Sequence, residues 1–253
     1  MPSYATVTLE QPADHVALVT MTPGEKIICL SEGLLRDLRD VLHRLAEDDR
    51  IRVLIITGTG KVFCAGADLK LLQRASPEEA RKYLDNVITL FSYLDSFPKP
   101  TIAAINGFAL GGGMEMTLAM DFRLISETAA IGLPESTLGI LPGAGGVQKL
   151  THFVGRGKAL EITLLGEPLS PAQASQLNLV FKVCPSHKLL EQSVALANRL
   201  AKMSPHALRS IKSLVRQAAT SGPEALDSFA LETMVSAFNT KELEDGLVSF
   251  FSK

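Results

Sequence analysis

Three consecutive glycines, Gly111 to Gly113, constrain the fold of this 253-residue chain more than any other feature. The apolar run from Met114 to Met120 that follows them has the composition of a buried helix. The glycine amides are therefore expected at a helix N-terminus, where the helix dipole favours negative charge and no side chain obstructs the backbone. The segment predicts either a close backbone contact or an anion-binding turn.

Two glutamates accompany this segment. Glu115 falls one turn into the apolar helix, and Glu135 falls between the apolar residues 131–134 and a second glycine-rich loop. A carboxylate in an apolar setting is costly unless it has a partner or a function. Taken singly, Glu115 is equally consistent with an ion pair to Arg123 or Lys149, and Glu135 with an acid in the first turn of a helix. Together, two carboxylates and a set of glycine amides indicate proton transfer on a carbonyl compound.

The bulk composition excludes several classes of protein. The chain is 46% hydrophobic and 21% charged with a formal net charge of -2, which is typical of a globular protein that does not bind nucleic acid electrostatically. No apolar run approaches the roughly 20 residues of a membrane span. Cys29, Cys64 and Cys184 lack metal-ligand spacing, and their odd number favours buried thiols over a disulfide framework. The N-terminal residues resemble neither a signal nor a transit peptide. We expect a cytoplasmic protein with no membrane partner and no metal site.

Alternating strand and helix patterns predict an α/β fold. β-branched apolar runs predict four strands, at residues 15–21, 52–57, 101–106 and 122–126. Polar capping residues predict helix starts at Ser31, Ser76, Ser170, Ser186 and Ser204. Helical patterns dominate from Gly145 onward, with one further strand-like run at 179–183. The order indicates an α/β core followed by a helical segment, with a boundary between roughly 190 and 205.

The C-terminal third carries two helical faces. Apolar residues recur at helical spacing from Leu189 to Leu200, in excess of what one thin layer buries, so this face is expected to contact other subunits. Arg209, Lys212 and Arg216 form a basic stripe, for which a solvated face is the simplest interpretation.

Three long motifs resemble the enoyl-CoA hydratase/isomerase family, also called the crotonase superfamily. They are VLIITGTGKVFCAGADLK (53–70), KPTIAAINGFALGGGMEMTLAMD (99–121) and IGLPESTLGILPGAGGVQKL (131–150), in the family's order. The resemblance implies a crotonase-like spiral of repeated ββα units with a C-terminal α-helical trimerisation region. We expect the core to span residues 1–195 and the oligomerisation region residues 196–253. The resemblance also implies an acyl-CoA thioester substrate and a homotrimer, or a homohexamer built from two trimers.

The same resemblance assigns roles to individual residues. The backbone N–H groups of Ala67 and Gly112 match the family's oxyanion hole, and Glu115 and Glu135 match the two glutamates of its hydratases. Substrate and coenzyme A contacts are expected at Ala65, Ala67, Asp68, Leu69, Lys70 and Gly112, with Lys26 as a further candidate. Without the resemblance, Asp68 is simply a helix cap and Lys26 a surface lysine. No metal is implied, and no cofactor other than the coenzyme A of the substrate.

The implied activity is that of an enoyl-CoA hydratase, which adds water to trans-2-enoyl-CoA to give 3-hydroxyacyl-CoA. Glu115 would orient and deprotonate the water, and Glu135 would protonate the α-carbon. Within the superfamily, the alternatives are an enoyl-CoA isomerase, a methylglutaconyl-CoA-type hydratase and a carrier-protein-linked dehydratase. Isomerases often keep only one of the two acids. An RNA-binding or scaffold protein with the same fold is the alternative of another class, which the net charge disfavours. Residues 22–30 depart from the family's pattern, which leaves the coenzyme contacts there open.

Overall fold

A six-stranded sheet forms the centre of the protein in the structure, a computed structural model that describes residues 4–23, 27–219 and 222–252. Its strands are, in spatial order, β1 (Val7–Ala13), β2 (Val16–Met21), β3 (Val53–Thr57), β5 (Thr101–Ile105), β7 (Phe122–Ser126) and β9 (Lys182–Cys184). β1 and β2 are antiparallel, and the other neighbours are parallel. The four predicted strands are confirmed. The strand expected at 179–183 begins only at Lys182, as β9, because Leu179 N is bonded to Ala174 O at the end of the preceding helix.

A second, three-stranded parallel sheet consists of β4 (Val62–Cys64), β6 (Phe108–Leu110) and β8 (Ile131–Gly132). Each of its strands directly follows a strand of the large sheet: β4 follows β3, β6 follows β5, and β8 follows β7. A helix or helical turn comes next each time. This repetition of strand, strand and helix confirms the predicted spiral of ββα units.

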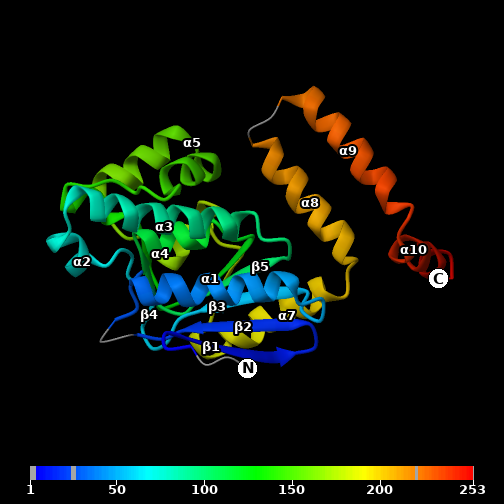
Figure 1. The fold of residues 1–253 in the computed structure, drawn as a ribbon, viewed down its shortest axis with the longest axis horizontal. Coiled ribbons are helices and arrows are strands. Elements are labelled where there is room, and N and C mark those ends of the chain that lie inside the picture. Colours follow the sequence, from blue (N-terminus) through cyan, green and yellow to red (C-terminus); the bar gives the residue numbers. More distant parts are fainter. Residues whose placement is uncertain (1–3, 24–26, 220–221, 253) are drawn as a thin grey trace.

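Helices cover both faces of the large sheet. On one face lie α1 (Glu32–Glu47), α3 (Pro77–Asp95), α4 (Gly112–Leu118) and α5 (Gly146–Leu165), which share the larger apolar core with alternate strand residues (Figure 1). On the other face, α7 (Leu189–Ala201) packs on the remaining strand residues. The sheet therefore separates two apolar layers, as expected for parallel strands buried on both sides.

Capping explains where several helices begin. Ser31 accepts from Leu34 N, and Ser76 forms a capping box with Glu79, as predicted. The predicted caps before α6 (Pro171–Gln176) and α8 (Pro205–Ala218) are also confirmed. The predicted cap at Ser186 is wrong. Ser186 begins the 3-10 turn η2 (Ser186–Lys188), and α7 starts afterwards at Leu189 without a side-chain cap.

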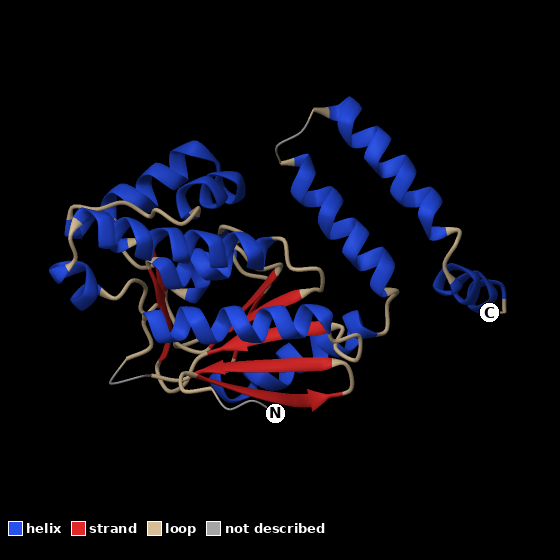
Figure 2. Cartoon of the chain, viewed as in Figure 1, coloured by secondary structure: helices blue, strands red, loops and turns tan. Residues whose placement is uncertain are grey.

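The last three helices form an arm beside the core. This C-terminal arm consists of α8, α9 (Pro223–Ala237) and α10 (Lys241–Phe251), and it projects away from the sheet (Figure 2). The arm exposes large apolar side chains: Ile211, Val215, Leu231, Met234, Phe238, Val248, Phe250 and Phe251. Of the apolar face of α7 that was expected to contact other subunits, Leu189, Leu196 and Leu200 pack on the subunit's own sheet, whereas Leu190 is exposed. The expected subunit contact stays a prediction. The predicted division between residues 195 and 196 falls inside α7 and stays a prediction.

One partly buried ion pair docks the arm onto the core. Lys212 Nζ of α8 lies 2.6 Å from Asp121 Oδ2, and it donates to the backbone oxygen of Lys99 at 2.8 Å. Asp121 also accepts from the N–H and hydroxyl of Thr101, where β5 begins. The interpretation of the basic stripe as a solvated face is therefore wrong for Lys212, whose side chain is only 17% exposed.

Candidate active site

Two short backbone segments form one wall of the candidate site. Ala65 N donates to Ile28 O, and Leu30 N donates to Gly66 O, both at 2.8 Å, so residues 28–30 run parallel to residues 65–67. The buried hydroxyl of Tyr83 on α3 bridges the two segments. It donates to Leu30 O at 2.9 Å and accepts from Asp68 N at 3.0 Å. The backbone on both sides of Ala67 is therefore held in place.

The glycine run packs directly against the loop of Ala67. Gly111 precedes α4 with φ of 53° and ψ of -126°, a conformation that L side chains rarely adopt. The chain then passes close to the loop of Ala67: a methyl group added to Gly112 would lie 3.8 Å from Ala67 N, and one added to Gly66 would lie 3.2 Å from Gly112 N. Within the described residues, no hydrogen-bond acceptor is found for the N–H of Ala67 or Gly112. The two amides form a neighbouring pair of available donors.

Glu115 lies in the first turn of α4 and is 4% exposed. Its Oε1 accepts from the backbone N–H groups of Ala144 and Gly146, both at 2.8 Å. Burial raises the pKa of Glu115, and the two N–H donors act in the opposite direction. The ion-pair alternatives are wrong, because Arg123 donates to the carbonyl oxygens of Thr117, Met120 and Leu179. Lys149 pairs with Asp95.

Glu135 lies in the 3-10 turn η1 (Pro134–Leu138) and is 8% exposed. Its Oε2 is buried and has no hydrogen-bond partner among the described residues. Burial raises the pKa of Glu135 to about 7, and the neighbouring charge of Glu115 adds to the increase. Oε1 faces the glycine run, since a methyl group added to Gly111 would lie 2.8 Å from it. The structure therefore brings the second acid next to the turn that carries the available amides.

The electrostatic surroundings of the two acids differ. Glu115 has two backbone donors on one oxygen, which stabilise the carboxylate. Glu135 has an unpartnered buried oxygen, which favours the protonated form. A pair of carboxyl groups in such different environments is the usual arrangement for one base and one acid working on the same substrate.

The remaining predicted contact residues lie around the Ala67 loop. Asp68 caps α2 (Leu69–Arg74) by accepting from Leu71 N at 3.1 Å, as the simpler interpretation expected. Leu69 and Lys70 are exposed on the first turn of that helix, and Ala65 is half-buried. Lys26 lies outside the described residues. Cys64, next to this loop, is fully buried, and burial raises the pKa of its thiol to about 12, so it is not a nucleophile at neutral pH.

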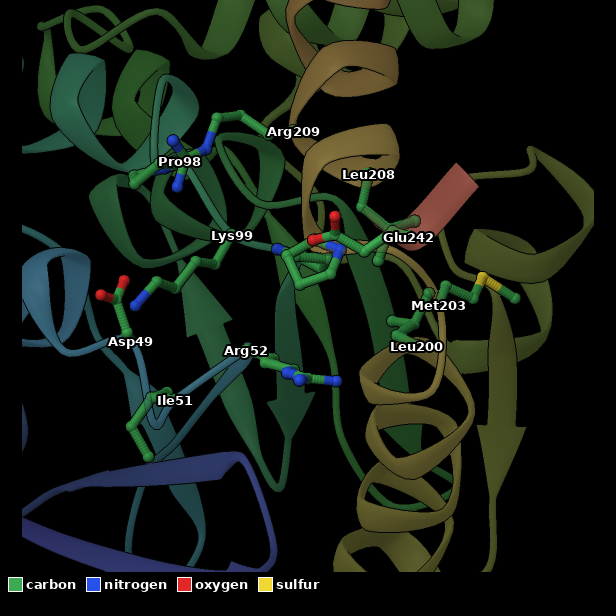
Figure 3. A pocket seen from close by; sticks show the side chains of 12 residues that line it. Asp49, Ile51, Arg52, Pro98, Lys99, Leu200, Met203, Leu208, Arg209 and Glu242 are labelled. Atoms are coloured by element: carbon green, nitrogen blue, oxygen red, sulfur yellow. The ribbon is translucent and has the colours of Figure 1, made fainter. Parts of the chain in front are cut away.

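A separate hollow of about 230 Å³ lies where the end of α7 and the start of α8 meet the core. Figure 3 shows Lys99 and Asp49 at one end of this hollow and Leu200 and Met203 at the other. Glu115, Glu135, the glycine run and the loop of Ala67 are not among the residues that line it. The hollow therefore lies apart from the two acids and the available amides.

Comparison with known proteins identifies the family. The model of the enoyl-CoA hydratase/isomerase family matches residues 11–253. The chain belongs to the enoyl-CoA hydratase/isomerase family. It is 38% identical to the 2,3-dehydroadipyl-CoA hydratase of Escherichia coli (strain K12), over 94% of this chain and 93% of that protein. It is 32% identical to the mitochondrial enoyl-CoA hydratase of Pongo abelii, over 94% of this chain and 81% of that protein.

Solved structures show the same fold. The 1.8 Å crystal structure of an enoyl-CoA hydratase from Bacillus anthracis superposes with a TM-score of 0.94 at 35% identity, covering 98% of this chain and 96% of that one. The enoyl-CoA hydratase/isomerase family acts on acyl-CoA thioesters. None of the helices in the described part of the chain has both the length and the apolar character needed to cross a bilayer.

Two features of this family member were missed by the sequence interpretation. The first is Tyr83. Its only signal in the sequence is that a tyrosine, which carries a hydroxyl group, lies among the apolar residues of the buried face of α3. The second is the pair formed by Lys149 and Asp95, which are distant in sequence and carry no pattern that links them. Both depend on how α3 lies beside the loop of Ala67 and the start of α5.

Proposed function

We propose that this family member is an enoyl-CoA hydratase that adds water to a trans-2-enoyl-CoA to give the 3-hydroxyacyl-CoA. The observation that carries the proposal is the meeting of two buried acids with a pair of available backbone amides. An isomerase moves one proton and needs one acid or base, whereas hydration takes a proton from water and gives one to carbon. The presence of both Glu115 and Glu135 favours hydration.

The amides of Ala67 and Gly112 are the proposed oxyanion hole. When water adds to the β-carbon, negative charge moves to the thioester oxygen, and two preorganised N–H donors stabilise the enolate that develops. Gly112 lies in the first turn of α4, where the helix dipole adds to this stabilisation. The loop of Ala65 to Leu69 is proposed to hold the coenzyme A part of the substrate.

The two glutamates are proposed to divide the proton transfers. Glu115, held by Ala144 and Gly146, orients the water and takes its proton. Glu135, whose raised pKa of about 7 keeps much of it protonated at neutral pH, donates a proton to the α-carbon. Each turnover returns both groups to their starting states once the product leaves and a proton passes from Glu115 to Glu135 or is exchanged with solvent.

The test is hydration of crotonyl-CoA by Glu115→Gln and Glu135→Gln, followed as loss of enoyl-thioester absorbance. Each variant keeps size and hydrogen-bonding capacity but loses proton transfer, so kcat should fall by about 10²–10⁴-fold. Glu161→Gln, on the exposed face of α5, is the matched control and should keep wild-type rates. Near-wild-type hydration by both active-site variants would contradict the proposal. Turnover of 3-enoyl-CoA alone by the wild-type protein would indicate an isomerase instead.

We further propose a homotrimer or homohexamer in the cytoplasm, with no cofactor beyond the coenzyme A of the substrate. The support for assembly is the C-terminal arm, whose exposed apolar side chains are more than an isolated subunit normally leaves in water. A panel of enoyl-CoA chain lengths, including one that ends in a carboxylate, is the measurement that defines the substrate.

A further inference from the structure

Lys149, in the first turn of α5, pairs with an aspartate and not with either active-site glutamate. Lys149 Nζ donates to Asp95 Oδ1 at the end of α3, at 2.5 Å, and the two side chains are 26% and 32% exposed. A charge-assisted hydrogen bond between partly buried groups fixes geometry better than an exposed pair does. The pair ties the start of α5 to α3.

The segment anchored in this way is the one that holds Glu115. The N–H of Lys149 donates to Gly145 O at 3.0 Å, which closes the first turn of α5 and holds the Gly145–Gly146 peptide group. The N–H of that peptide group and the N–H of Ala144 are the two donors to Glu115. Gly145 is the N-cap of α5, with φ of 94°, and no side chain caps this helix. A helix start without a side-chain cap depends on other contacts for its position.

The same loop leads back to the second acid. Ile140 N donates to Glu135 O at 3.2 Å, and the chain then runs through the glycine-rich loop to Ala144. A shift of the start of α5 would therefore change the place of the Glu115 carboxylate relative to Glu135. An error of about 1 Å in the position of a reacting group lowers rates by as much as about 10²-fold.

Asp95 has a second cation nearby. Lys212 of α8, paired with Asp121, lies within the electrostatic reach of Asp95. Asp95 therefore keeps a neighbouring positive charge when Lys149 is replaced, so we expect such a variant to fold and the arm to stay docked.

We propose that Lys149 and Asp95 are positioning residues, whose ion pair holds the amides of Ala144 and Gly146 in the place where they orient Glu115 for proton abstraction from water. The inference rests on the proposed hydratase function. The pair does not touch the loop of Ala67, so the binding of coenzyme A does not depend on it.

The experiment compares Lys149→Met with Lys149→Arg and Lys158→Met. The first removes the charge, the second keeps it, and the third removes a charge from the exposed Lys158–Glu161 pair on the same helix. With crotonyl-CoA, kcat of Lys149→Met should fall about 10- to 100-fold with little change in KM. Lys149→Arg and Lys158→Met should stay near wild type. Asp95→Asn should match Lys149→Met, and the double variant should be no worse than either single one, because both remove the same contact.

Two outcomes would overturn the inference: an unchanged kcat in both Lys149→Met and Asp95→Asn, or a loss confined to KM. If Lys149→Met does not fold by circular dichroism, Asp95→Asn carries the test, since it nearly preserves size. Failure of the proposed function is recognised separately, because then the wild-type protein would not hydrate crotonyl-CoA, or Glu115→Gln and Glu135→Gln would both hydrate it at near-wild-type rates. If Glu115→Gln is inactive and Lys149→Met is fully active, only the positioning role of Lys149 is rejected, and the proposed hydratase function stands.

Discussion

The contact between Gly113 and the strand below it allows a sharp test of the packing around the candidate site. A methyl group added to Gly113 would lie 2.0 Å from Cys64 O and 2.8 Å from its carbonyl carbon, where ordinary contacts are 3.4–4 Å. The obstructing atoms are backbone atoms of β4, so no rotamer change relieves them. For Gly113→Ala, α4 and β4 would have to separate by more than about 1 Å.

The neighbouring glycine provides the matched control. A methyl group added to Gly112 would lie 2.6 Å from Leu30 Cδ1, the end of a side chain, which can shift more readily than backbone atoms. Both changes gain at most about 1 kcal/mol of helix propensity. Overpacking costs about 1–3 kcal/mol, and we place Gly113→Ala at about 3 kcal/mol and Gly112→Ala at about 1 kcal/mol or less.

Thermal melting at one fixed protein concentration is the assay. A change of 1 kcal/mol moves Tm by roughly 2–4 °C in a chain near this size, so Gly113→Ala should lower Tm by about 6–12 °C and Gly112→Ala by less than about 4 °C. Light scattering must show the same assembly for all three proteins, since dissociation also lowers Tm. If Gly113→Ala melts with the wild type or above Gly112→Ala, the close approach of α4 to β4 is not what requires glycine there.

Three further predictions concern the site wall, pH and assembly. Tyr83→Phe leaves Leu30 O and Asp68 N unpaired, so we expect a loss of about 1–3 kcal/mol in unfolding free energy and a lower kcat; unchanged values would show that the hydroxyl bridge is unimportant. Because the pKa of Glu135 is raised from 4.5 to about 7, its contribution to stability is fully present below about pH 4.5 and is lost as pH rises through 7. Glu135→Gln should therefore melt above the wild type at pH 8 and level with it at pH 4, and the opposite order would refute this sign. Light scattering should show a trimer or hexamer at micromolar concentration, and a stable monomer would contradict the proposed assembly.

Local signals account for the parts of the fold that were predicted. The strand of Val53 to Thr57 is buried on both faces and therefore reads as a continuous apolar run, and Ser76 with Glu79 forms a cap that depends only on neighbours in sequence. The strands β4, β6 and β8 have two or three residues each, too few to show a period. These strands form because they pair with one another in the second sheet, and the residues of a single strand do not predict that pairing.

The candidate site shows the same division between local and distant causes. The two glutamates and the glycine run were predicted because their motifs carry them in sequence order. The partner of Glu115 was not, because its donors are backbone N–H groups beyond η1, and a backbone amide has no residue-specific signal. Arg123 and Lys149 were plausible partners by charge alone, but their side chains reach other acceptors.

The donors of the candidate site, at Ala67, Gly112, Ala144 and Gly146, all belong to the main chain. Most substitutions leave an N–H in place, and only proline removes it outright. Sequence drift can therefore alter the side chains that line the site without abolishing the N–H groups at these four positions. Divergence to 32–38% identity from related hydratases is compatible with an unchanged set of donors. Under the proposed function, such a site can change its acyl substrate through its lining while the path of the chain keeps these donors in place.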